Sequence, residues 1–331
     1  GIPREGVGKV PQWMLQAPQE DPPTKATIDV MCLNLWNFNH WEPRIPMLQD
    51  LVIRTLPDII GFQEVRSTRS APDGVRTRHQ VSDLAKVLPG YQYVYEPAMM
   101  FEQGEELHQE GLAIFSRYPI LKTDFLKLSR DPHDSGDFHQ RLCLRALIST
   151  PIGEINFMST HLSLSERARR RTMEEIGKFI NSDETPAIIV GDFNSEILKE
   201  LPEWPGKFGL TDTWKALNPD QPESQGWTFN SWFPKSRIDY IFSRHLTPLQ
   251  FSIEGTSTIP TNLPPIAGVD DMKGVLFPSD HMFPTASLGV GLSDSTSISS
   301  SSTEHYSRAA VPAADTSQSQ SRSPVGTSSA Q

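Results

Sequence analysis

The chain has few of the features that mark secreted or membrane-spanning proteins. Only two of its 331 residues are cysteine, Cys32 and Cys143, and both lie in apolar runs, which predicts buried free thiols. It has no Asn-x-Ser/Thr sequon, no visible signal peptide and no apolar stretch of the roughly 20 residues that a membrane-spanning helix needs. An intracellular location is therefore favoured, although a removed leader would leave the same evidence.

Basic charge is also scarce. The chain has 30 Lys and Arg residues against 40 Asp and Glu residues, a formal net charge of −10. This balance argues against a protein that binds polyanions without specificity, because that mode of binding needs a basic surface. A local basic rim remains compatible with the net charge and would steer a phosphate group toward a bound cation.

Large apolar residues are scarce at both ends of the chain. Residues 291–331 are mainly Ser, Thr, Ala, Gln and Pro, a composition that predicts a disordered Ser-rich tail. Residues 1–26 contain five prolines and are predicted to be a Pro-rich linker. The chain does not begin with Met, which indicates a processed or partial protein. Residues 27–290 remain as one large domain, which we expect to be monomeric.

Within residues 27–290, short apolar runs alternate with amphipathic segments. The runs predict strands at residues 28–35, 58–62, 91–95, 112–115, 142–148, 155–159, 187–190, 238–242, 247–253 and 282–288. Helical spacing predicts helices at residues 45–56 and at residues 165–180, the second capped by Ser165. Helical and hairpin connections together favour an α/β fold in which two sheets pack face to face with helices outside.

Five short polar motifs lie at the ends of apolar runs, in one order along the chain. They are Leu33-Asn34, Gln63-Glu64, Thr160-His161-Leu162, Gly191-Asp192-Phe193-Asn194 and Ser279-Asp280-His281. Polar side chains at strand ends can converge on one pocket. Together they supply the carboxylate, amide and imidazole groups that are needed to bind a hard divalent cation and to attack a phosphate ester.

These motifs, with Arg237-Ile238-Asp239-Tyr240-Ile241 between the last two, resemble those of the endonuclease/exonuclease/phosphatase superfamily. This superfamily of metal-dependent phosphoesterases includes deoxyribonucleases, abasic-site endonucleases, neutral sphingomyelinases and inositol polyphosphate phosphatases. The resemblance covers residues 28–288 and implies a four-layer α/β/β/α sandwich of two mixed sheets. It also implies that residues 27–290 form a catalytic domain.

The resemblance implies a metal site at Glu64, with Asn34 and Asp280 around it. A cation such as Mg²⁺ prefers one or two carboxylates together with water and substrate oxygen, so a site with few protein ligands is chemically reasonable. Mn²⁺ is expected to substitute for Mg²⁺, because the ligands are hard oxygen atoms and no thiolate is present. For Glu64, the alternative is a surface acid that begins a loop.

The catalytic candidates are His161, Asp192, Asn194, Asp239 and His281. The imidazole of His281 titrates near neutral pH, so it can take a proton from water or donate one to a phosphate oxygen. Asp239 is predicted to orient His281, with a purely structural acid as the alternative. The resemblance implies that Asp192 and Asn194 orient the attacking water and hold a phosphoryl oxygen. His161 is predicted to bind the phosphate or to assist the leaving oxygen, with a buried structural histidine as the alternative.

Substrate identity is less clearly encoded. Arg141, which begins the strand that is predicted to pair with the strand of His161, is a candidate phosphate contact, with a structural ion pair as the alternative. Four arginines, Arg66, Arg69, Arg76 and Arg78, are predicted to lie in a loop after Glu64, either solvated or as a clamp for further phosphates. Arginines 167 and 169–171 are predicted to face partly outward on their helix.

Two predicted loops carry apolar side chains. One begins at residues 98–101, and the other covers residues 259–278 with Leu263, Ile266 and Leu276. They suit a lipid or aromatic substrate if exposed, but folding back onto the domain is the favoured prediction. Residues 131–139 hold two histidines and three aspartates whose spacing matches no standard metal site, so a polar loop on the substrate side is favoured there.

The partner is therefore expected to be a phosphate-ester substrate. A nuclease or nucleotide phosphodiesterase is slightly favoured over a phospholipid or phosphoinositide phosphoesterase. An inactive binding module is disfavoured, because the metal-ligand and histidine positions are intact.

Overall fold

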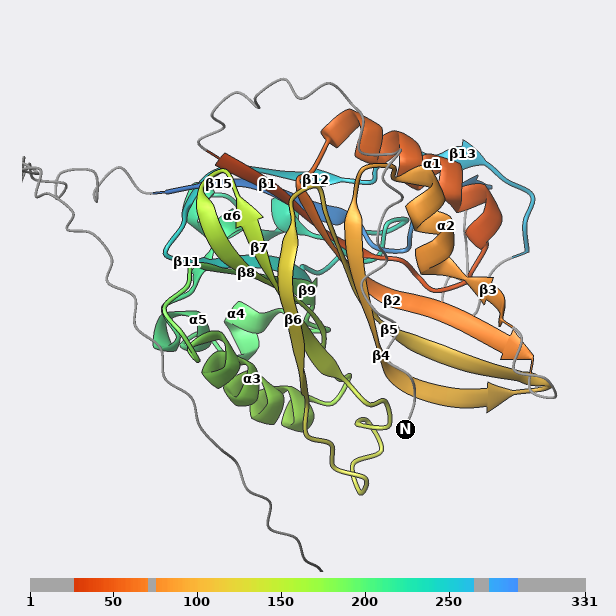
Figure 1. The fold of residues 1–331 in the computed structure, drawn as a ribbon, viewed down its shortest axis with the longest axis horizontal. Coiled ribbons are helices and arrows are strands. Elements are labelled where there is room, and N and C mark those ends of the chain that lie inside the picture. Colours follow the sequence, from red (N-terminus) through yellow and green to blue (C-terminus); the bar gives the residue numbers. More distant parts are fainter. Residues whose placement is uncertain (1–26, 71–75, 265–273, 291–331) are drawn as a thin grey trace, which may run out of the picture. The chain divides into compact units, whose positions relative to one another are not determined.

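In the computed structural model, two large sheets are built from the described residues, which are 27–70, 76–264 and 274–290 (Figure 1). The first sheet has the strand order β12 (Thr247–Glu254), β15 (Phe283–Gly289), β1 (Thr27–Asn34), β2 (Ile59–Ser70), β5 (Glu106–Ser116) and β4 (Gln92–Gln103), with β3 (Arg76–His79) beside β2. The second sheet has the order β10 (Thr211–Asp212), β11 (Asp239–Arg244), β9 (Ala187–Asp192), β8 (Gly153–His161), β7 (Leu142–Thr150) and β6 (Ile120–Lys127). A small third sheet pairs β13 (Ile259–Pro260) with β14 (Val275–Leu276).

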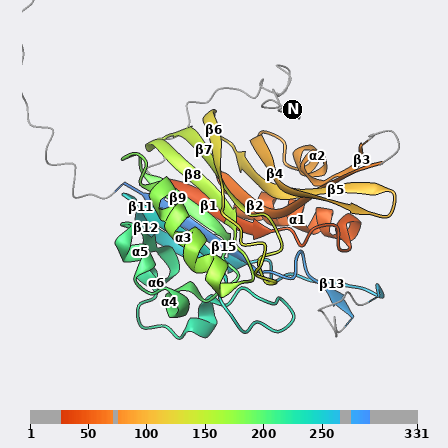
Figure 2. The ribbon, with the colours of Figure 1, turned by 90° about the horizontal axis from the view of Figure 1, so that it is seen from below.

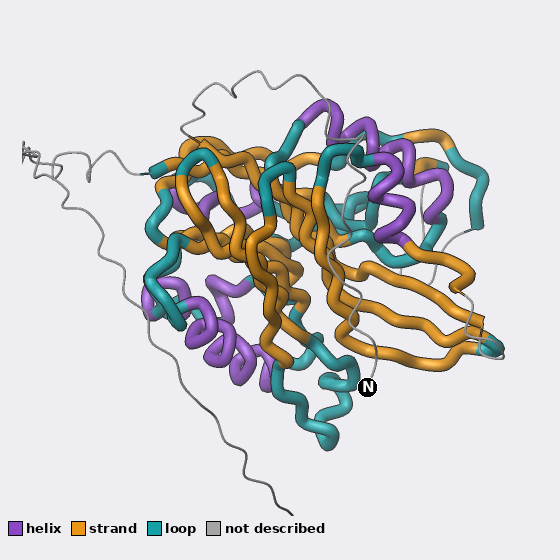
Figure 3. Tube along the Cα trace, viewed as in Figure 1, coloured by secondary structure: helices purple, strands orange, loops and turns teal. Residues whose placement is uncertain are grey.

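Helices cover the outer faces of the two large sheets, as the tube in Figure 3 shows. They are α1 (Trp41–Thr55), α2 (Gln80–Val87), α3 (Glu166–Ile180), α4 (Ile197–Glu200), α5 (Trp204–Lys207), α6 (Thr213–Leu217) and the 3-10 helix Glu223–Gly226. Both sheets are mixed, because β1 runs parallel to β2 and β8 runs parallel to β9, whereas the other pairs of neighbouring strands are antiparallel. The predicted α/β/β/α sandwich is therefore confirmed. None of the helices in the described part of the chain is long and apolar enough to cross a membrane.

The alternation of side chains along β1 explains why its sequence is apolar almost throughout. Val30 and Cys32 face the second sheet, whereas Met31 and Leu33 pack against the layer of α1 and α2. The two sheets approach closely at Gly61, where an added Cβ would lie only 2.4 Å from Cγ2 of Val190. Cys32 and Cys143 are both buried and free, as predicted.

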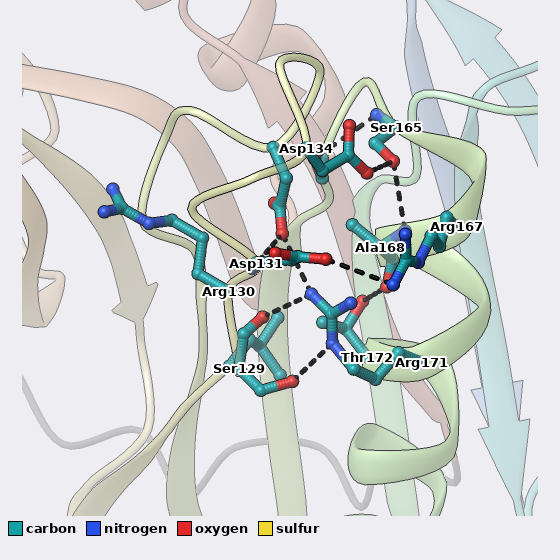
Figure 4. Close-up of polar contacts among 12 residues, drawn as sticks. Ser129, Arg130, Asp131, Asp134, Ser165, Arg167, Ala168, Arg171 and Thr172 are labelled. Atoms are coloured by element: carbon teal, nitrogen blue, oxygen red, sulfur yellow. Dashed lines mark hydrogen bonds and ion pairs between the residues drawn. The ribbon is translucent and has the colours of Figure 1, made fainter.

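Helix α3 forms much as its sequence pattern predicts and lies over β8 and β9 (Figure 2). Its cap is Ser165, whose hydroxyl accepts a hydrogen bond from the amide of Ala168 at 3.1 Å (Figure 4). The predicted outward orientation is wrong for Arg169, which is buried and pairs with Glu200 at 2.7 Å. A guanidinium that is satisfied by a carboxylate can occupy the buried face of a helix.

Two segments that were predicted to be loops are strands. β2 continues past Glu64 to Ser70 and pairs with β3, so the predicted arginine loop is wrong. Residues 98–101 belong to β4, which forms a long hairpin with β5. In β2 the alternation of side chains between the two faces of the sheet is interrupted, because the register of its pairing with β5 shifts between Phe62 and Val65. These extended strands project together to one side of the molecule (Figure 1).

The insertion at residues 259–278 folds back onto the domain, as predicted, at least where it is described. Leu276 is fully buried in a cluster with Trp36 and Trp232. Leu263 is 39% exposed. Ile266, the predicted linker at residues 1–26 and the predicted tail at residues 291–331 lie outside the described residues.

Candidate active site

Strand register places three of the predicted side chains next to one another in the second sheet. His161 at the end of β8 lies beside Asp192 at the end of β9, because these strands are parallel. Asp239 begins β11, which runs antiparallel to β9, and it also pairs with Asp192. In the first sheet, Asn34 lies beside Gln63 in the parallel pair of β1 and β2. The motifs therefore meet at one edge of the sandwich.

Asp192 is the centre of the polar cluster. Its Oδ2 accepts a hydrogen bond from Nδ2 of Asn34 at 3.0 Å and lies 3.4 Å from Nε2 of His161 and 3.6 Å from Nε2 of His281. Its Oδ1 accepts a hydrogen bond from the backbone amide of Asn194 at 2.8 Å. Burial raises the pKa of the Asp192 carboxyl to about 6.

Glu64 is aimed into the same cluster by a β-bulge. Gln63 and Glu64 together oppose Leu112, and Glu64 has a φ of 54°, a left-handed conformation that is uncommon outside glycine. The carboxylate of Glu64 accepts a hydrogen bond from Asn34 at 3.4 Å and another from Asn37 at 3.1 Å. Such backbone strain concentrates at functional sites, and here it turns the carboxylate of Glu64 away from the strand ladder and toward Asn34 and Asn37.

His281 and Asp239 form a buried pair. Nδ1 of His281 lies 2.8 Å from Oδ2 of Asp239, and both side chains are almost fully buried. The second oxygen of Asp239, Oδ1, is buried and has no hydrogen-bond partner. The carboxylate therefore directs one oxygen to the imidazole, the orienting contact that the sequence analysis predicts.

The two histidines are in opposite electrostatic environments. Burial opposes a charge on His281, but the carboxylates of Asp239 and Asp192 outweigh it and hold the pKa of His281 well above its usual value. Burial, followed by the positive charges of Arg141 and His281, holds the pKa of His161 well below its usual value. These shifts favour the charged form of His281 and the neutral form of His161.

Of the predicted metal ligands, Glu64 and Asp280 offer carboxylate oxygens, whereas Oδ1 of Asn34 accepts a hydrogen bond from the backbone amide of Trp36 at 2.9 Å and its Nδ2 faces Glu64. Burial raises the pKa of the Glu64 carboxyl, with the charges of Glu110 and Asp192 acting in the same direction. Burial also raises the pKa of Asp280 to about 6, and Glu64 adds to this shift. Buried carboxylates that repel one another fit a divalent cation, whose charge would stabilise their ionised forms.

Among the described residues, one group of three metal-ligating types is compact enough to hold an ion: Asp192, Asp239 and His281, with atoms within 4.8 Å of one another. In that group, the 2.8 Å contact already links His281 to Asp239. Two candidate arrangements therefore adjoin each other, and Asp192 contacts both, through Asn34 and through His281.

Arg44 is a residue of the site that the sequence analysis missed. It is fully buried, and its N–H groups donate hydrogen bonds to five backbone carbonyls. Four of these lie in the segment after Asn34, and the fifth is Pro278, two residues before Asp280. Its charge acts on Asp280 and Glu64. The sequence signal was its position four residues before Leu48, on the buried face of α1.

The arginines near the predicted site differ in whether they form an ion pair with a carboxylate. Arg141 acts electrostatically on His161 and Asp192, and its buried Nε has no hydrogen-bond partner. Arg145 instead forms a structural pair with Asp124 at 2.6 Å. Arg66 pairs with Glu110 at 2.5 Å, and Arg78 pairs with Glu42 at 2.9 Å. Neither of these two is a free clamp for further phosphates.

Comparison with known proteins identifies the family to which this chain belongs. The family model described as Endonuclease/Exonuclease/phosphatase family matches residues 31–281. The chain belongs to this family. Its members are phosphoesterase hydrolases that depend on a metal. The matched range contains all nine of the predicted site residues.

Solved structures of the family have the same fold at low sequence identity. A family protein from Bacteroides thetaiotaomicron is similar with a TM-score of 0.60 and 23% identity, over 80% of this chain and 96% of that one. A mannosyl-6-phosphatase of the same species has a TM-score of 0.59 and 23% identity, over 79% and 99%. TDP2 of D. rerio, complexed with a single-strand DNA product, has a TM-score of 0.58 and 16% identity, over 80% and 100%.

Proposed function

We propose that this protein is a divalent-cation-dependent phosphodiesterase that hydrolyses its substrate by in-line attack of water, with a nucleotide or nucleic acid as the leading substrate class. One observation carries the proposal. Nε2 of His281 and Nε2 of His161 both lie within 3.6 Å of a single oxygen of Asp192, and the opposite shifts in their pKa favour a charged His281 and a neutral His161. This arrangement places a proton donor, a proton acceptor and a neutral hydrogen-bonding group around the space where a phosphate would react.

The side chains divide the work according to their charge. The ionised Asp192 orients the attacking water and accepts its proton, and Asn194 helps to hold the phosphoryl oxygen. The imidazolium of His281, oriented by Asp239, donates to a phosphate oxygen as negative charge develops. Neutral His161 binds the phosphate or assists the leaving oxygen. The cation, held by Asn34, Glu64 and Asp280, would supply electrostatic stabilisation of the same charge.

Several features favour a small phosphodiester over a long polyanion. The net charge is −10, and the pairs of Arg66 with Glu110 and of Arg78 with Glu42 remove two basic groups from substrate binding. Leu276, in the segment that would suit a lipid if it were exposed, is buried. The similarity to TDP2 with its DNA product supports a nucleotide, whereas the similarity to a mannosyl-6-phosphatase makes a phosphomonoester the second candidate.

A substrate panel tests this proposal. Turnover should be measured with Mg²⁺ on bis(p-nitrophenyl) phosphate, oligonucleotides, a sugar phosphate, sphingomyelin and a phosphoinositide. We expect phosphodiester hydrolysis to cease in excess chelator and to return with Mg²⁺ or Mn²⁺, because the proposed ligands are hard oxygen atoms. Glu64→Gln should weaken the response to the cation. Full turnover in excess chelator would reject the metal assignment, and preference for a monoester would replace the diester by the second candidate.

Arg44 provides a prediction about the metal site that does not depend on turnover. Arg44→Lys keeps the charge but cannot reach five carbonyls, so the segments that carry Asn34 and Asp280 should lose their alignment. We expect Mg²⁺ affinity to fall by about 10-fold or more, the usual effect of losing a group that positions metal ligands. The measurement is the rise in Tm that Mg²⁺ causes, since ligand stabilisation depends on Kd.

The matched control is Arg244→Lys. Arg244 is also buried and bonds the backbone carbonyls of Asp183 and Thr185, but it ends β11 at the far edge of the sheet from Asp239. Its substitution should lower the Tm and leave the Mg²⁺-induced rise unchanged. If both variants have a lower Tm but the same Mg²⁺-induced rise in Tm as the wild type, Arg44 has a structural role alone.

A further inference from the structure

The segment between β1 and α1, residues 35–40, has an unusual backbone. Trp36, Asn37 and His40 have φ values of 53°, 42° and 46°, in the left-handed region that is uncommon for residues other than glycine. Local strain of this kind persists only where the surrounding structure holds it in place. From this segment, the side chain of Asn37 reaches the carboxylate of Glu64.

Asn34 and Asn37 hold the carboxylate of Glu64 from two directions. Nδ2 of Asn34 donates to Oε1 of Glu64 at 3.4 Å, and Nδ2 of Asn37 donates to Oε2 at 3.1 Å. Nδ2 of Asn34 also donates to Asp192 at 3.0 Å, so the closer contact with Glu64 is the one from Asn37. Each oxygen of Glu64 accepts one amide N–H and keeps a further lone pair for a cation.

The backbone of Asn37 is anchored by two buried side chains. Its carbonyl accepts hydrogen bonds from Arg44 at 2.9 Å and from Nε2 of Gln80 at 2.5 Å. Gln80 is fully buried, and its Oε1 accepts a hydrogen bond at 2.7 Å from the backbone amide of Arg66, two residues after Glu64. Gln80 thereby links the segment that carries the amide donor to the strand that carries the carboxylate. The contact between Asn37 and Glu64 is thus supported from outside the pair.

We propose that Asn37 is a positioning residue that restricts the rotation of the Glu64 carboxylate and so selects a small divalent cation. This inference rests on the proposed function, in which Glu64 is a metal ligand. Mg²⁺ demands nearly ideal octahedral geometry, whereas Ca²⁺ accepts flexible arrangements and carboxylates that bind through one or both oxygens. A carboxylate that is held in one orientation therefore favours Mg²⁺, and a carboxylate that can turn favours Mg²⁺ less.

Asn37→Gly tests this role without turnover, because glycine adopts the left-handed conformation readily and the substitution removes only the side-chain amide. Mg²⁺ and Ca²⁺ should be titrated separately into the metal-free protein by calorimetry, without substrate. The Kd for Mg²⁺ is expected to rise by about 10-fold or more, the usual effect of losing a group that orients a metal ligand. The Kd for Ca²⁺ should rise by a smaller factor. A general loss of stability would not change the ratio of the two constants.

The matched control is Leu56→Gly. Leu56 also has a left-handed backbone, with a φ of 47°, but it follows the opposite end of α1 from Asn37, and its side chain is 56% exposed. Its substitution releases the same kind of strain and should leave both dissociation constants unchanged. A loss of Mg²⁺ affinity of equal size in Leu56→Gly would overturn the specific contact between Asn37 and Glu64.

The other outcomes separate this inference from the proposed function. An Asn37→Gly protein that keeps the wild-type affinity for Mg²⁺ would overturn the positioning role and leave Glu64 in place as a metal ligand. Equal losses of Mg²⁺ and Ca²⁺ affinity would overturn the selection of the smaller cation. Failure of the wild-type protein to bind either cation would overturn the metal site of the proposed function itself.

Discussion

His281→Ala should lower kcat by about 10²- to 10⁴-fold, the range for removing a group that transfers or donates a proton in the reaction. The side chain lies 2.8 Å from Asp239 and 3.6 Å from Asp192, and both carboxylates raise its pKa. Alanine removes the imidazole whose positive charge these carboxylates stabilise. The measurement is kcat on the substrate that the panel identifies, with folding checked by circular dichroism.

Asp239→Asn should also impair turnover, but through His281. The amide keeps the size of the side chain and removes the charge that holds the pKa of the imidazole high, so the pKa of His281 should fall in an NMR titration. The double variant should be little worse than His281→Ala alone, because the group that Asp239 serves is already absent. Losses in kcat that multiply fully would refute this coupling and require a separate role for Asp239.

The sequence allowed much of the site to be predicted, because its chemistry is concentrated at strand ends. His161, Asp192 and Asp239 each lie at the end of a strand, where a short apolar run and its polar terminus are visible together. The fold could be predicted from the same apolar runs, because strands that are buried on both faces have nearly continuous hydrophobic sequences. Glu64 was also predicted, although the orientation of its side chain depends on a β-bulge, which the periodic pattern of apolar residues does not reveal.

The misses have physical causes as well. The extension of β2 after Glu64 contains one apolar residue, Val65, and residues 98–101 of β4 are an unbroken apolar run, so the alternation that predicts a strand is missing from both. Arg44 and Arg169 are charged residues on buried helix faces, and only their partners reveal why burial is tolerated. Those partners, Pro278 and Glu200, are distant in sequence, and pairing over such distances is not encoded in local patterns.

The second prediction of large effect concerns Asp192, the residue on which the cluster converges. Asp192→Asn keeps the shape of the side chain and can still accept a hydrogen bond from the amide of Asn194, but it cannot take a proton from water. We expect kcat to fall by about 10²- to 10⁴-fold, because general-base catalysis would be lost. Since Asp192 also raises the pKa of His281, that pKa should fall in this variant too.

The pH dependence gives a further test of Asp192. Its pKa is raised to about 6, so the ionised, active form is lost as the pH falls through about 6, and the wild-type rate should decline there on the acidic side. Asp280 also has a pKa raised to about 6, so the residual rate of Asp192→Asn should keep only the part of the decline that is due to Asp280 and be less steep. Asp58→Asn is the control, because Asp58 is equally buried but precedes β2 and accepts a hydrogen bond from the amide of Asp29, near the end of β1 that is opposite Asn34. It should cost stability and leave kcat nearly unchanged. An Asp192→Asn protein that retains kcat within about threefold would show that the attacking water is activated elsewhere.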